Sequence, residues 1–294
     1  MFHFGLYVTL LDYCFEITKS RRISEIKHRS ITNWLKKRYK YFILEHFDQA
    51  NKFIHGEIPK QIWICWWDGI EMMPPLVKAC YSSVLRYSND FKVTVITKNN
   101  YAEYIFIPDH VMKKVNNKKM TITHFSNIIR MALLYKHGGL WLDATFLVTD
   151  TIKLENNSFF TIRREYNGTN ISKGRWTGNC IAGAPNFYFF GFIQEFLCEY
   201  WKKYDHLITY HLYDYSINLA FESFPVLQEI FGNISPFNKN DIIVNNLKNE
   251  FDHLLFKKAI ENTILHKLSW KRTGPTRIFG NKLTFYGYIL ENYL

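Results

Sequence analysis

Residues 123–149 join three features in one segment: a helical pattern, a pair of glycines, and an apolar run that carries one acid. Apolar residues recur at three- and four-residue steps before the glycines, which predicts an amphipathic helix. Gly138 and Gly139 end this helix at His137, because glycine readily adopts the left-handed conformation that closes a helix. Residues 140–148 are nearly all apolar or β-branched, as in a strand that is covered on both faces. The segment therefore predicts an α/β architecture.

Asp143 interrupts this apolar run. A carboxylate inside a buried strand is unfavourable unless it meets a cation or several hydrogen-bond donors, and a metal ion or a ligand hydroxyl would be such a partner. Alternatively, Asp143 lies just past the end of a short strand, where it caps a turn or pairs with Arg130. Spacing alone favours the second interpretation, so the role of Asp143 depends on the rest of the chain.

Strand and helix patterns alternate through the first half of the chain. Strands are predicted at residues 61–67 and 91–98, and helices from Pro74 and Pro75 to about Tyr87 and after Pro108. This alternation predicts a mainly parallel sheet flanked by helices, in which ligands bind at the carboxyl ends of the strands. Those ends are residues 66–69, 97–99 and 143–145. Trp66 or Trp67 can stack on a flat base there, although a tryptophan at a strand end is more often a core residue.

The second half of the chain has a mixed α+β pattern and no glycine loop of the phosphate-binding type. Strands are predicted at residues 158–165 and 179–184, and helices at 187–204, 213–223 and 225–231. Residues 264–271, with the sequence ILHKLSWK, gather a histidine, two lysines, a serine and a tryptophan. This stretch either meets a diphosphate and a metal or forms only a basic surface strand.

Much of the net charge of +11 lies in the amino-terminal arm, where residues 19–40 hold nine Lys or Arg against Glu25. An aromatic-rich stripe with helical spacing runs through residues 31–47. Such a helix either lies on an anionic membrane surface, where each cation contributes about 1 kcal/mol, or docks its stripe on the protein's own core. Nucleic acid ranks below both partners, because no nucleic-acid-binding module accompanies the charge. We expect residues 1–57 to form a basic helical arm and residues 58–294 to form one domain.

The chain shows no signal for export or membrane insertion. No apolar run approaches about 18 residues, and the nearest, residues 2–15, is broken by Asp12 and lacks a basic leader. Five scattered cysteines without a C-x-x-C pair predict reduced packing residues. We therefore expect a cytoplasmic protein, which the basic arm would hold at the inner face of the cell membrane.

Residues 126–145, SNIIRMALLYKHGGLWLDAT, resemble the nucleotide-sugar signature of glycosyltransferase family 32 and the related capsular polysaccharide synthesis proteins. In that signature a Ser-Asp-x-x-Arg helix precedes Gly-Gly-x-x-x-Asp, and the last Asp begins an Asp-x-Asp motif. Upstream, residues 58–69, IPKQIWICWWDG, are similar to the family's first strand, and ILHKLSWK is a weaker match to its carboxyl-terminal end. The paired motifs stand in the family's order, and the resemblance covers roughly residues 58–186.

This resemblance implies a GT-A fold, a Rossmann-like sheet that binds a sugar nucleotide through residues 58–150, with residues 151–294 as the acceptor half. It implies that Asp143 and Arg130 are the catalytic residues, and that Asp143 faces the ribose and a metal. Trp66 and Trp67 would lie beside the base. The other residues that it places at the nucleotide sugar are Ser126, Asn127, Gly139, Asn179, Lys267 and Lys271.

Two positions depart from the family's pattern. Asn127 stands in place of the Asp of Ser-Asp, and Thr145 stands in place of the second acid of Asp-x-Asp, which is usually the direct metal ligand. The resemblance implies a divalent cation, Mn²⁺ or Mg²⁺, held by Asp143 and Thr145, with His266 completing its shell. A site with a single carboxylate would bind such a cation weakly.

The resemblance implies a retaining transferase that moves a hexose from a nucleotide sugar, expected to be UDP-linked, to a lipid-linked glycan in capsular polysaccharide or lipopolysaccharide biosynthesis. The sequence offers no clear nucleophile, and nothing ranks three acids of the second half, Asp205, Asp214 and Glu222. The changes at Asn127 and Thr145 leave a second interpretation open, a catalytically decayed nucleotide- or glycan-binding protein on the same fold. A glycoside hydrolase ranks last, because it needs two facing carboxylates and Asp143 has no obvious partner.

Overall fold

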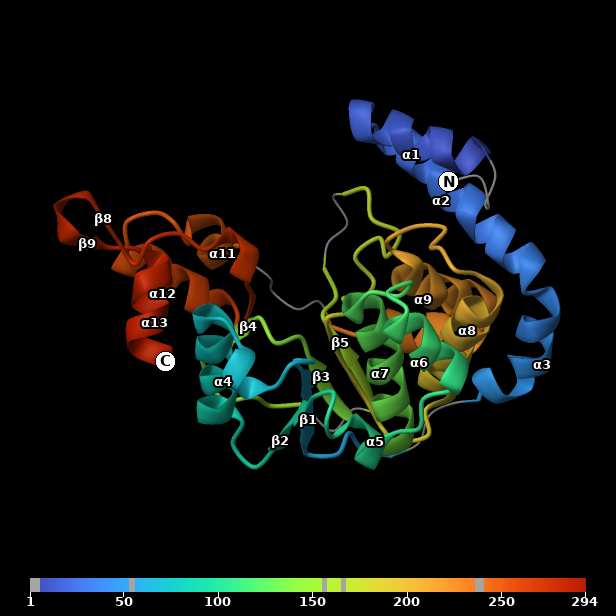
Figure 1. Ribbon diagram of the computed structural model, residues 1–294, viewed down its shortest axis with the longest axis horizontal. Coiled ribbons are helices and arrows are strands. Elements are labelled where there is room, and N and C mark those ends of the chain that lie inside the picture. The colour runs from blue at the N-terminus through green and yellow to red at the C-terminus, as the bar shows by residue number, and fades with distance from the viewer. Residues whose placement is uncertain (1–5, 53–55, 155–157, 165–167, 236–240) are drawn as a thin grey trace.

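The computed structural model describes residues 6–52, 56–154, 158–164, 168–235 and 241–294. At its centre is a five-stranded sheet in the order β2-β1-β3-β6-β5, with helices on both sides (Figure 1). Its strands are β1 (Gln61–Cys65), β2 (Lys92–Ile96), β3 (Gly139–Leu142), β5 (Phe159–Thr161) and β6 (Cys180–Gly183). β1 pairs in parallel with β2 and β3, whereas β6 pairs antiparallel with β3 and β5. Only β6 runs against the other strands of this sheet, so the predicted mainly parallel α/β fold is confirmed.

Side chains alternate between the two faces of this sheet, and each face has its own apolar core. Trp63 of β1 and Trp141 of β3 face the larger core, whereas Ile62 and Leu140 of the same strands face the other. Both strands are thus covered on both faces, as their continuous apolar sequences predict. The larger core contains α5 (Tyr101–Tyr104), α6 (Asp109–Asn116), α7 (Ile122–His137), α8 (Tyr188–Lys203), α9 (Leu212–Ser223) and α10 (Pro225–Gly232); the other contains α4 (Pro75–Tyr87).

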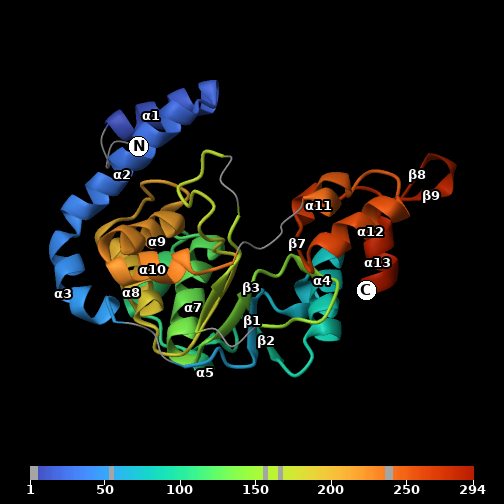
Figure 2. The same ribbon diagram turned by 180° about the vertical axis from the view of Figure 1, so that it is seen from behind.

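Residues 241–294 form a smaller lobe that packs against α4, as the reverse view shows (Figure 2). Leu76 and Cys80 of α4 share a third apolar core with Phe285 and Ile289. The lobe has a second attachment. Its strand β7 pairs antiparallel with β4 (Phe146–Val148), which follows β3 in the chain. These two attachments fix the position of β7 relative to the sheet. The lobe's elements are α11 (Ile242–Asn246), α12 (His253–Asn262), β7 (Leu265–Lys267), β8 (Arg277–Ile278), β9 (Lys282–Leu283) and α13 (Phe285–Tyr293).

The prediction of a single strand at residues 140–148 is wrong, because the structure has two strands there. β3 ends at Leu142, and a turn in which the Phe146 amide donates to the Asp143 carbonyl (3.1 Å) separates it from β4. β4 then leaves the five-stranded sheet and pairs with β7. Every residue of both strands is buried, so the apolar run carries no sign of this change of partner.

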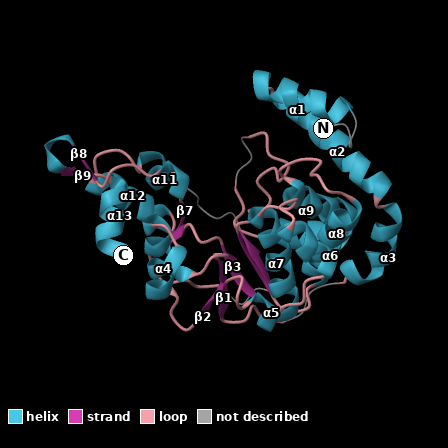
Figure 3. Cartoon of the chain, viewed as in Figure 1, coloured by secondary structure: helices cyan, strands magenta, loops and turns pink. Residues whose placement is uncertain are grey.

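The arm is helical, as predicted, but its helix breaks at Tyr39 into α2 (Arg21–Arg38) and α3 (Lys40–Ala50). The break turns Phe42 onto Phe192 of α8, with 5.3 Å between the ring centroids. The secondary-structure view shows α2 and α3 following the outside of the helical layer (Figure 3).

The aromatic stripe of the arm docks on the protein's own core. Ile31, Leu35 and Tyr39 are at most 2% exposed and belong to the larger core. The cations beside them, such as Arg29 and Lys37, remain exposed. Of the two interpretations of residues 31–47, docking on the core is therefore confirmed for the stripe. α1 (Leu6–Thr18) packs against α2.

The remaining predicted elements are confirmed with small shifts at their ends. The strand predicted at residues 158–165 is shorter, because β5 ends at Thr161; its expected end at Glu165 lies outside the described residues. All five cysteines are free, and Cys80, Cys180 and Cys198 are buried. Within the described ranges, we find no helix of the length and apolarity needed to cross a bilayer.

Gly139, the first residue of β3, has a φ of 97° and lies against the backbone of β1. A β-carbon there would lie 2.6 Å from the Gln61 carbonyl oxygen. We expect Gly139→Ala to lower the free energy of unfolding by about 2 kcal/mol or more, measured by urea titration. The control is Gly232→Ala, since a β-carbon at Gly232 meets no atom within 4 Å. Equal urea midpoints for the two variants would contradict a close backbone approach at Gly139.

Candidate functional site

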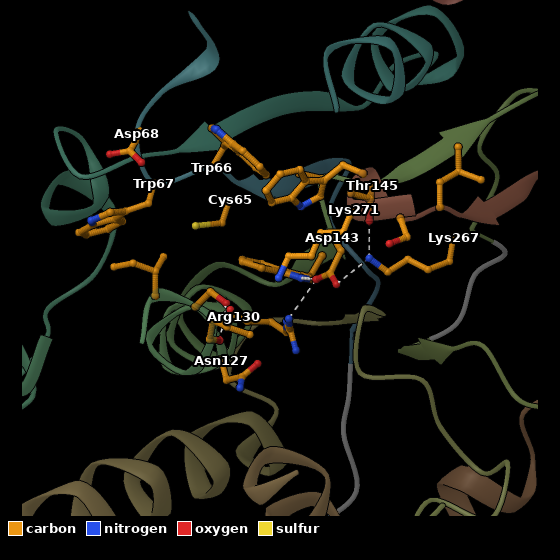
Figure 4. A pocket seen from close by; sticks show the side chains of 18 of the residues that line it. Cys65, Trp66, Trp67, Asp68, Asn127, Arg130, Asp143, Thr145, Lys267 and Lys271 are labelled. Atoms are coloured by element: carbon orange, nitrogen blue, oxygen red, sulfur yellow. Dashed lines mark hydrogen bonds and ion pairs between the residues drawn. The ribbon is translucent and has the colours of Figure 1, made fainter. Parts of the chain in front are cut away.

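A cavity of about 540 Å³ opens where the parallel strands end and the smaller lobe begins (Figure 4). β1 and β3 lie side by side, so the residues that follow them meet at this edge. The sequence predicts a ligand site at the same edge. Its lining residues come from four segments, within residues 65–68, 122–130, 141–145 and 267–271, and from Tyr210.

Three donors hold the Asp143 carboxylate in this cavity. Its Oδ1 accepts hydrogen bonds from Trp141 Nε1 (2.9 Å) and Arg130 Nη2 (3.1 Å), and its Oδ2 lies 3.2 Å from Lys267 Nζ. The side chain is 29% exposed. The two interpretations of Asp143 are therefore compatible: it follows a short strand and pairs with Arg130, and it also lines a cavity large enough for a ligand.

The neighbouring cations control the charge of Asp143. Burial would raise the pKa of its carboxyl, but Lys267 and Arg130 outweigh burial and hold the pKa below its usual value. Asp143 is therefore ionised at neutral pH. It accepts hydrogen bonds and does not act as a proton donor to a substrate.

Arg130 is buried between two aromatic rings. Its guanidinium carbon lies 4.8 Å from the centroid of Trp141 and 4.7 Å from that of Tyr213, and the residue is 5% exposed. The guanidinium cannot leave this position without losing both ring contacts and its carboxylate partner. α7 and β3 thus fix the direction in which Arg130 faces the cavity. Tyr213 could not be predicted from the sequence, because an aromatic residue in a helical pattern carries no functional signal.

Trp66 and Trp67 line the cavity just past the last residue of β1 (Figure 4). Both rings are partly buried: Trp67 meets Phe125 edge-on with 5.2 Å between centroids, and Trp66 meets Trp270 at 6.2 Å. Each tryptophan is therefore both a packing residue and a part of the cavity wall. The polar residues Ser126 and Asn127, on α7, line the same cavity.

The ladder between β4 and β7 brings Lys267 to Asp143. Phe146 pairs with Lys267 in this ladder, which sets Lys267 beside the turn that carries Asp143 and Thr145. The Lys267 ammonium donates a hydrogen bond to Thr145 Oγ1 while it contacts Asp143 (Figure 4). Lys271, in the short 3₁₀ helix Trp270–Arg272, lines the same cavity. Residues 264–271 are therefore more than a basic surface strand.

Two other predicted site residues, His266 and Gly139, are not brought to the cavity. His266 precedes Lys267 in β7, so its side chain points to the opposite face of the strand. It is 2% exposed, its Nε2 lies 3.3 Å from Thr149 Oγ1, and burial lowers its pKa to about 4. Gly139 begins β3, at the opposite end of the strand from Asp143. Its role is the close approach to β1 described above.

The residues expected to hold a divalent cation do not fit one. Mg²⁺ and Mn²⁺ take about six oxygen ligands, and their sites combine carboxylates with phosphate and water oxygens. Here both oxygens of the single carboxylate, Asp143, already contact protein donors, and the Thr145 hydroxyl accepts a hydrogen bond from the Lys267 ammonium. A divalent cation placed between Asp143 and Thr145 would meet that ammonium group. In the part of the chain that the structure describes, no three His, Cys, Asp or Glu side chains form a metal-binding group.

A second cavity, of about 490 Å³, shares five lining residues with the first: Thr123, Asn127, Arg130, Asp143 and Tyr210. Asn179 lines it, and the Asn179 carbonyl accepts a hydrogen bond from the Asp143 amide (2.9 Å). The buried Oδ1 of Asn179 has no hydrogen-bond partner. The second cavity extends to Lys27, so the amino-terminal arm forms part of its wall.

The structure separates the three acids that the sequence left unranked. Asp214, on α9, lines the second cavity and accepts a hydrogen bond from Trp176 Nε1 (3.2 Å). Asp205 contacts Lys114 and Lys119, and Glu222 contacts Lys36, and neither acid lines a cavity described here. Asp214 is thus the acid of the three that is placed to meet a ligand. Its neighbours in sequence gave no signal of this, because the cavity is built from segments far apart in the chain.

Part of the chain is similar in sequence to two proteins that are named as glycosyltransferases. The chain is 29% identical over 104 residues to O-glycosyltransferase PaGT of Phomopsis amygdali, a match to 32% of this chain and 25% of that protein. It is 26% identical over 94 residues to O-glycosyltransferase braB of Annulohypoxylon truncatum, a match to 29% of this chain and 22% of that protein. The chain therefore spans well under half of either relative. The solved structure of the PaToxG glycosyltransferase aligns over 71% of this chain and 84% of its own, with a TM-score of 0.47 and 13% identity.

A family model described as capsular polysaccharide synthesis protein matches residues 12–287, which is most of the chain. The matched residues include the Gly-Gly and Asp143 motif, the two tryptophans after β1, and Lys267 and Lys271. The resemblance found in the sequence motifs is confirmed. The chain belongs to the family of capsular polysaccharide synthesis proteins.

Proposed function

We propose that this protein is a retaining glycosyltransferase that transfers a hexose from a nucleotide sugar, with UDP as the expected nucleotide, to a glycan. The observation that carries the proposal is an ionised Asp143, held by Arg130 and Lys267 at the carboxyl edge of a parallel sheet, inside a cavity. The names of the two curated relatives and the family membership support this activity.

The first cavity offers a suitable surface for each part of the donor. Trp66 and Trp67 supply flat apolar area for the base, and Asp143 is an acceptor for a ribose hydroxyl. Lys267 and Lys271 are charge partners for the diphosphate. The hexose then lies where the two cavities meet, beside Asn127, Arg130 and Asn179.

Transfer breaks the bond between the anomeric carbon and the diphosphate oxygen, which keeps the electron pair. The acceptor hydroxyl forms the new bond from the same face, and its proton passes to the departing diphosphate. Arg130 and the two lysines stabilise the negative charge that grows on this leaving group. Because both oxygens of Asp143 are engaged by protein donors, we assign Asp143 to positioning the cations and the donor, and not to nucleophilic attack.

We assign the glycan acceptor to the second cavity. Asp214 is an acceptor for a sugar hydroxyl, and Asn179 Oδ1 lacks a protein partner. Tyr210 and the indole of Trp176 also line this cavity, and aromatic surface beside polar groups suits a sugar ring. The cavity reaches the first one at the position proposed for the hexose, so donor and acceptor would meet there.

The arm supports a lipid-linked acceptor at the inner face of the cell membrane, in capsular polysaccharide or lipopolysaccharide biosynthesis. The docked stripe is unavailable to lipid, but α1 exposes Leu10, Tyr13 and Ile17 at three- and four-residue steps. Exposed cations follow at Lys19, Arg22 and Arg29. Exposed apolar and cationic side chains on one helical hairpin match an anionic lipid surface.

One observation favours the alternative of a catalytically decayed binding protein. Asn127 and Thr145 both stand where the family's motif has carboxylates. Such a protein would bind UDP without turnover. The contacts of Arg130 and Lys267 with Asp143 favour an intact transferase. They hold two positive charges in the cavity, where these charges can stabilise a departing diphosphate.

Asp143→Asn tests the donor site. The amide keeps an oxygen for Trp141 and Arg130 but removes the charge that positions Arg130 and Lys267. We expect the variant to fold and its turnover to fall about 100-fold or more, measured as UDP release from UDP-hexoses. Asp90→Asn, at an exposed acid that contacts Lys60, is the control. Full turnover in Asp143→Asn would contradict the assignment, and UDP binding without turnover in the native protein would favour the decayed alternative.

Asp214→Asn tests the acceptor site. We expect the KM for an acceptor sugar to rise about tenfold, because a hydrogen bond to a charged group is lost, while UDP affinity stays the same. Methyl and octyl glycosides of glucose, galactose and mannose are the acceptor probes, and calorimetry measures UDP affinity. Asp205→Asn, at the acid that contacts Lys114 and Lys119, is the control. Equal acceptor use by the two variants would place the acceptor elsewhere.

Leu10→Gln tests the membrane surface, because it removes exposed apolar area from α1. We expect it to lower the fraction of protein that sediments with phosphatidylglycerol vesicles. Leu254→Gln, at an exposed leucine of α12 in the other lobe, is the control and should sediment as the native protein does. Binding that is equal for both variants, or equal on neutral phosphatidylcholine vesicles, would contradict an anionic lipid partner for α1.

A further inference from the structure

The Lys267 ammonium lies between Asp143 and Thr145, the two residues that the sequence resemblance implies as ligands of a divalent cation. It contacts Asp143 Oδ2 at 3.2 Å and donates a hydrogen bond to Thr145 Oγ1, so it bridges the first and last positions of the Asp-Ala-Thr turn (Figure 4). These are the two positions that would carry acids in Asp-x-Asp. The third residue is a neutral hydroxyl that accepts from the ammonium without cancelling its charge.

The position of Lys267 is set by the backbone and not by a flexible surface contact. Lys267 pairs with Phe146 in the β4–β7 ladder, and the Leu268 amide donates to the Thr145 carbonyl (2.8 Å). The Lys267 side chain is 26% exposed, and its ammonium lies 5.6 Å from the Phe146 ring centroid. A charge held in this way needs little reorganisation when a ligand binds.

The charges of the first cavity favour a diphosphate. Its lining contains three cations, Arg130, Lys267 and Lys271, and two carboxylates. One carboxylate, Asp68, already has a partner in Lys98 at 3.2 Å. The other, Asp143, is shared between Arg130 and Lys267. Positive charge therefore remains for an anionic ligand.

We propose that Lys267 replaces the divalent cation, so that the protein binds a nucleoside diphosphate and transfers its sugar without metal. This inference rests on the proposed function and adds the identity of the cation to it. As the bond from the anomeric carbon to the diphosphate oxygen breaks, the Lys267 ammonium donates a hydrogen bond to the diphosphate and remains protonated. Lys271 supplies the second positive charge that a divalent ion would bring. The proton of the acceptor hydroxyl passes to the diphosphate, as described above.

Calorimetry of UDP binding to the full chain tests the proposal directly. We expect the same UDP affinity in EDTA as in Mn²⁺, and UDP-hexose turnover that EDTA does not change. Lys267→Met should weaken UDP binding about tenfold to 100-fold, because a charge-assisted contact is lost. Lys257→Met is the matched control, at an exposed lysine of α12 in the same lobe. Thermal melting shows whether each variant is folded.

An exchange of the two groups gives a second, independent measurement. The double variant Thr145→Asp, Lys267→Gln restores a second carboxylate and removes the ammonium, so its UDP affinity should become dependent on Mn²⁺. Loss of UDP binding to the native protein in EDTA, or unchanged UDP affinity in folded Lys267→Met, would overturn the role of Lys267 and leave the proposed transferase intact. If UDP, GDP and their sugars bind neither with Mn²⁺ nor with EDTA, the proposed function fails, and this inference fails with it.

Discussion

The contact of one carboxylate with three donors joins the segments of this protein that matter for its site. Trp141 belongs to β3, Arg130 to α7 and Lys267 to β7, and all three donors meet at Asp143. Removing any donor would leave a partly buried charge with fewer partners, which is unfavourable. The three segments are therefore coupled through electrostatics as well as through packing. The three donors that contact Asp143 also line the cavity, so the same residues determine its shape and its charge.

Much of the architecture could be predicted from local sequence, and the failures have a common cause. The α7 helix, its end at His137 and the parallel strands follow from periodicity and glycine chemistry, which act over a few residues. The end of β3 at Leu142 could not be predicted, because β4 remains apolar while it changes sheets. The position of His266 away from the cavity could not be predicted for a similar reason. Its place depends on which face of β7 meets Asp143, and only the pairing with β4 decides that.

The site residues divide in the same way. Asp143, Arg130 and the two tryptophans stand in motifs that sequence alone reveals, and the structure brings them to one cavity. Asp214 and Tyr213 come from α9, whose pattern is that of an ordinary buried helix. The arm showed a similar ambiguity, since its stripe fits either a membrane or a core until Ile31 and Leu35 are found buried. Long-range contacts carry this information, and one sequence does not display them.

The ladder between β4 and β7 also has a consequence for the order of events during folding. Thr145 and Lys267 are separated by 122 positions in the sequence. A growing chain therefore contains the turn with Asp143 and Thr145 long before it contains Lys267. Until then Asp143 lacks its second cation. α7 forms through local contacts, whereas the β4–β7 ladder closes this long loop, so we expect the ladder to form later than α7. The cavity therefore gains Lys267, and with it the second cation at Asp143, only when the smaller lobe docks.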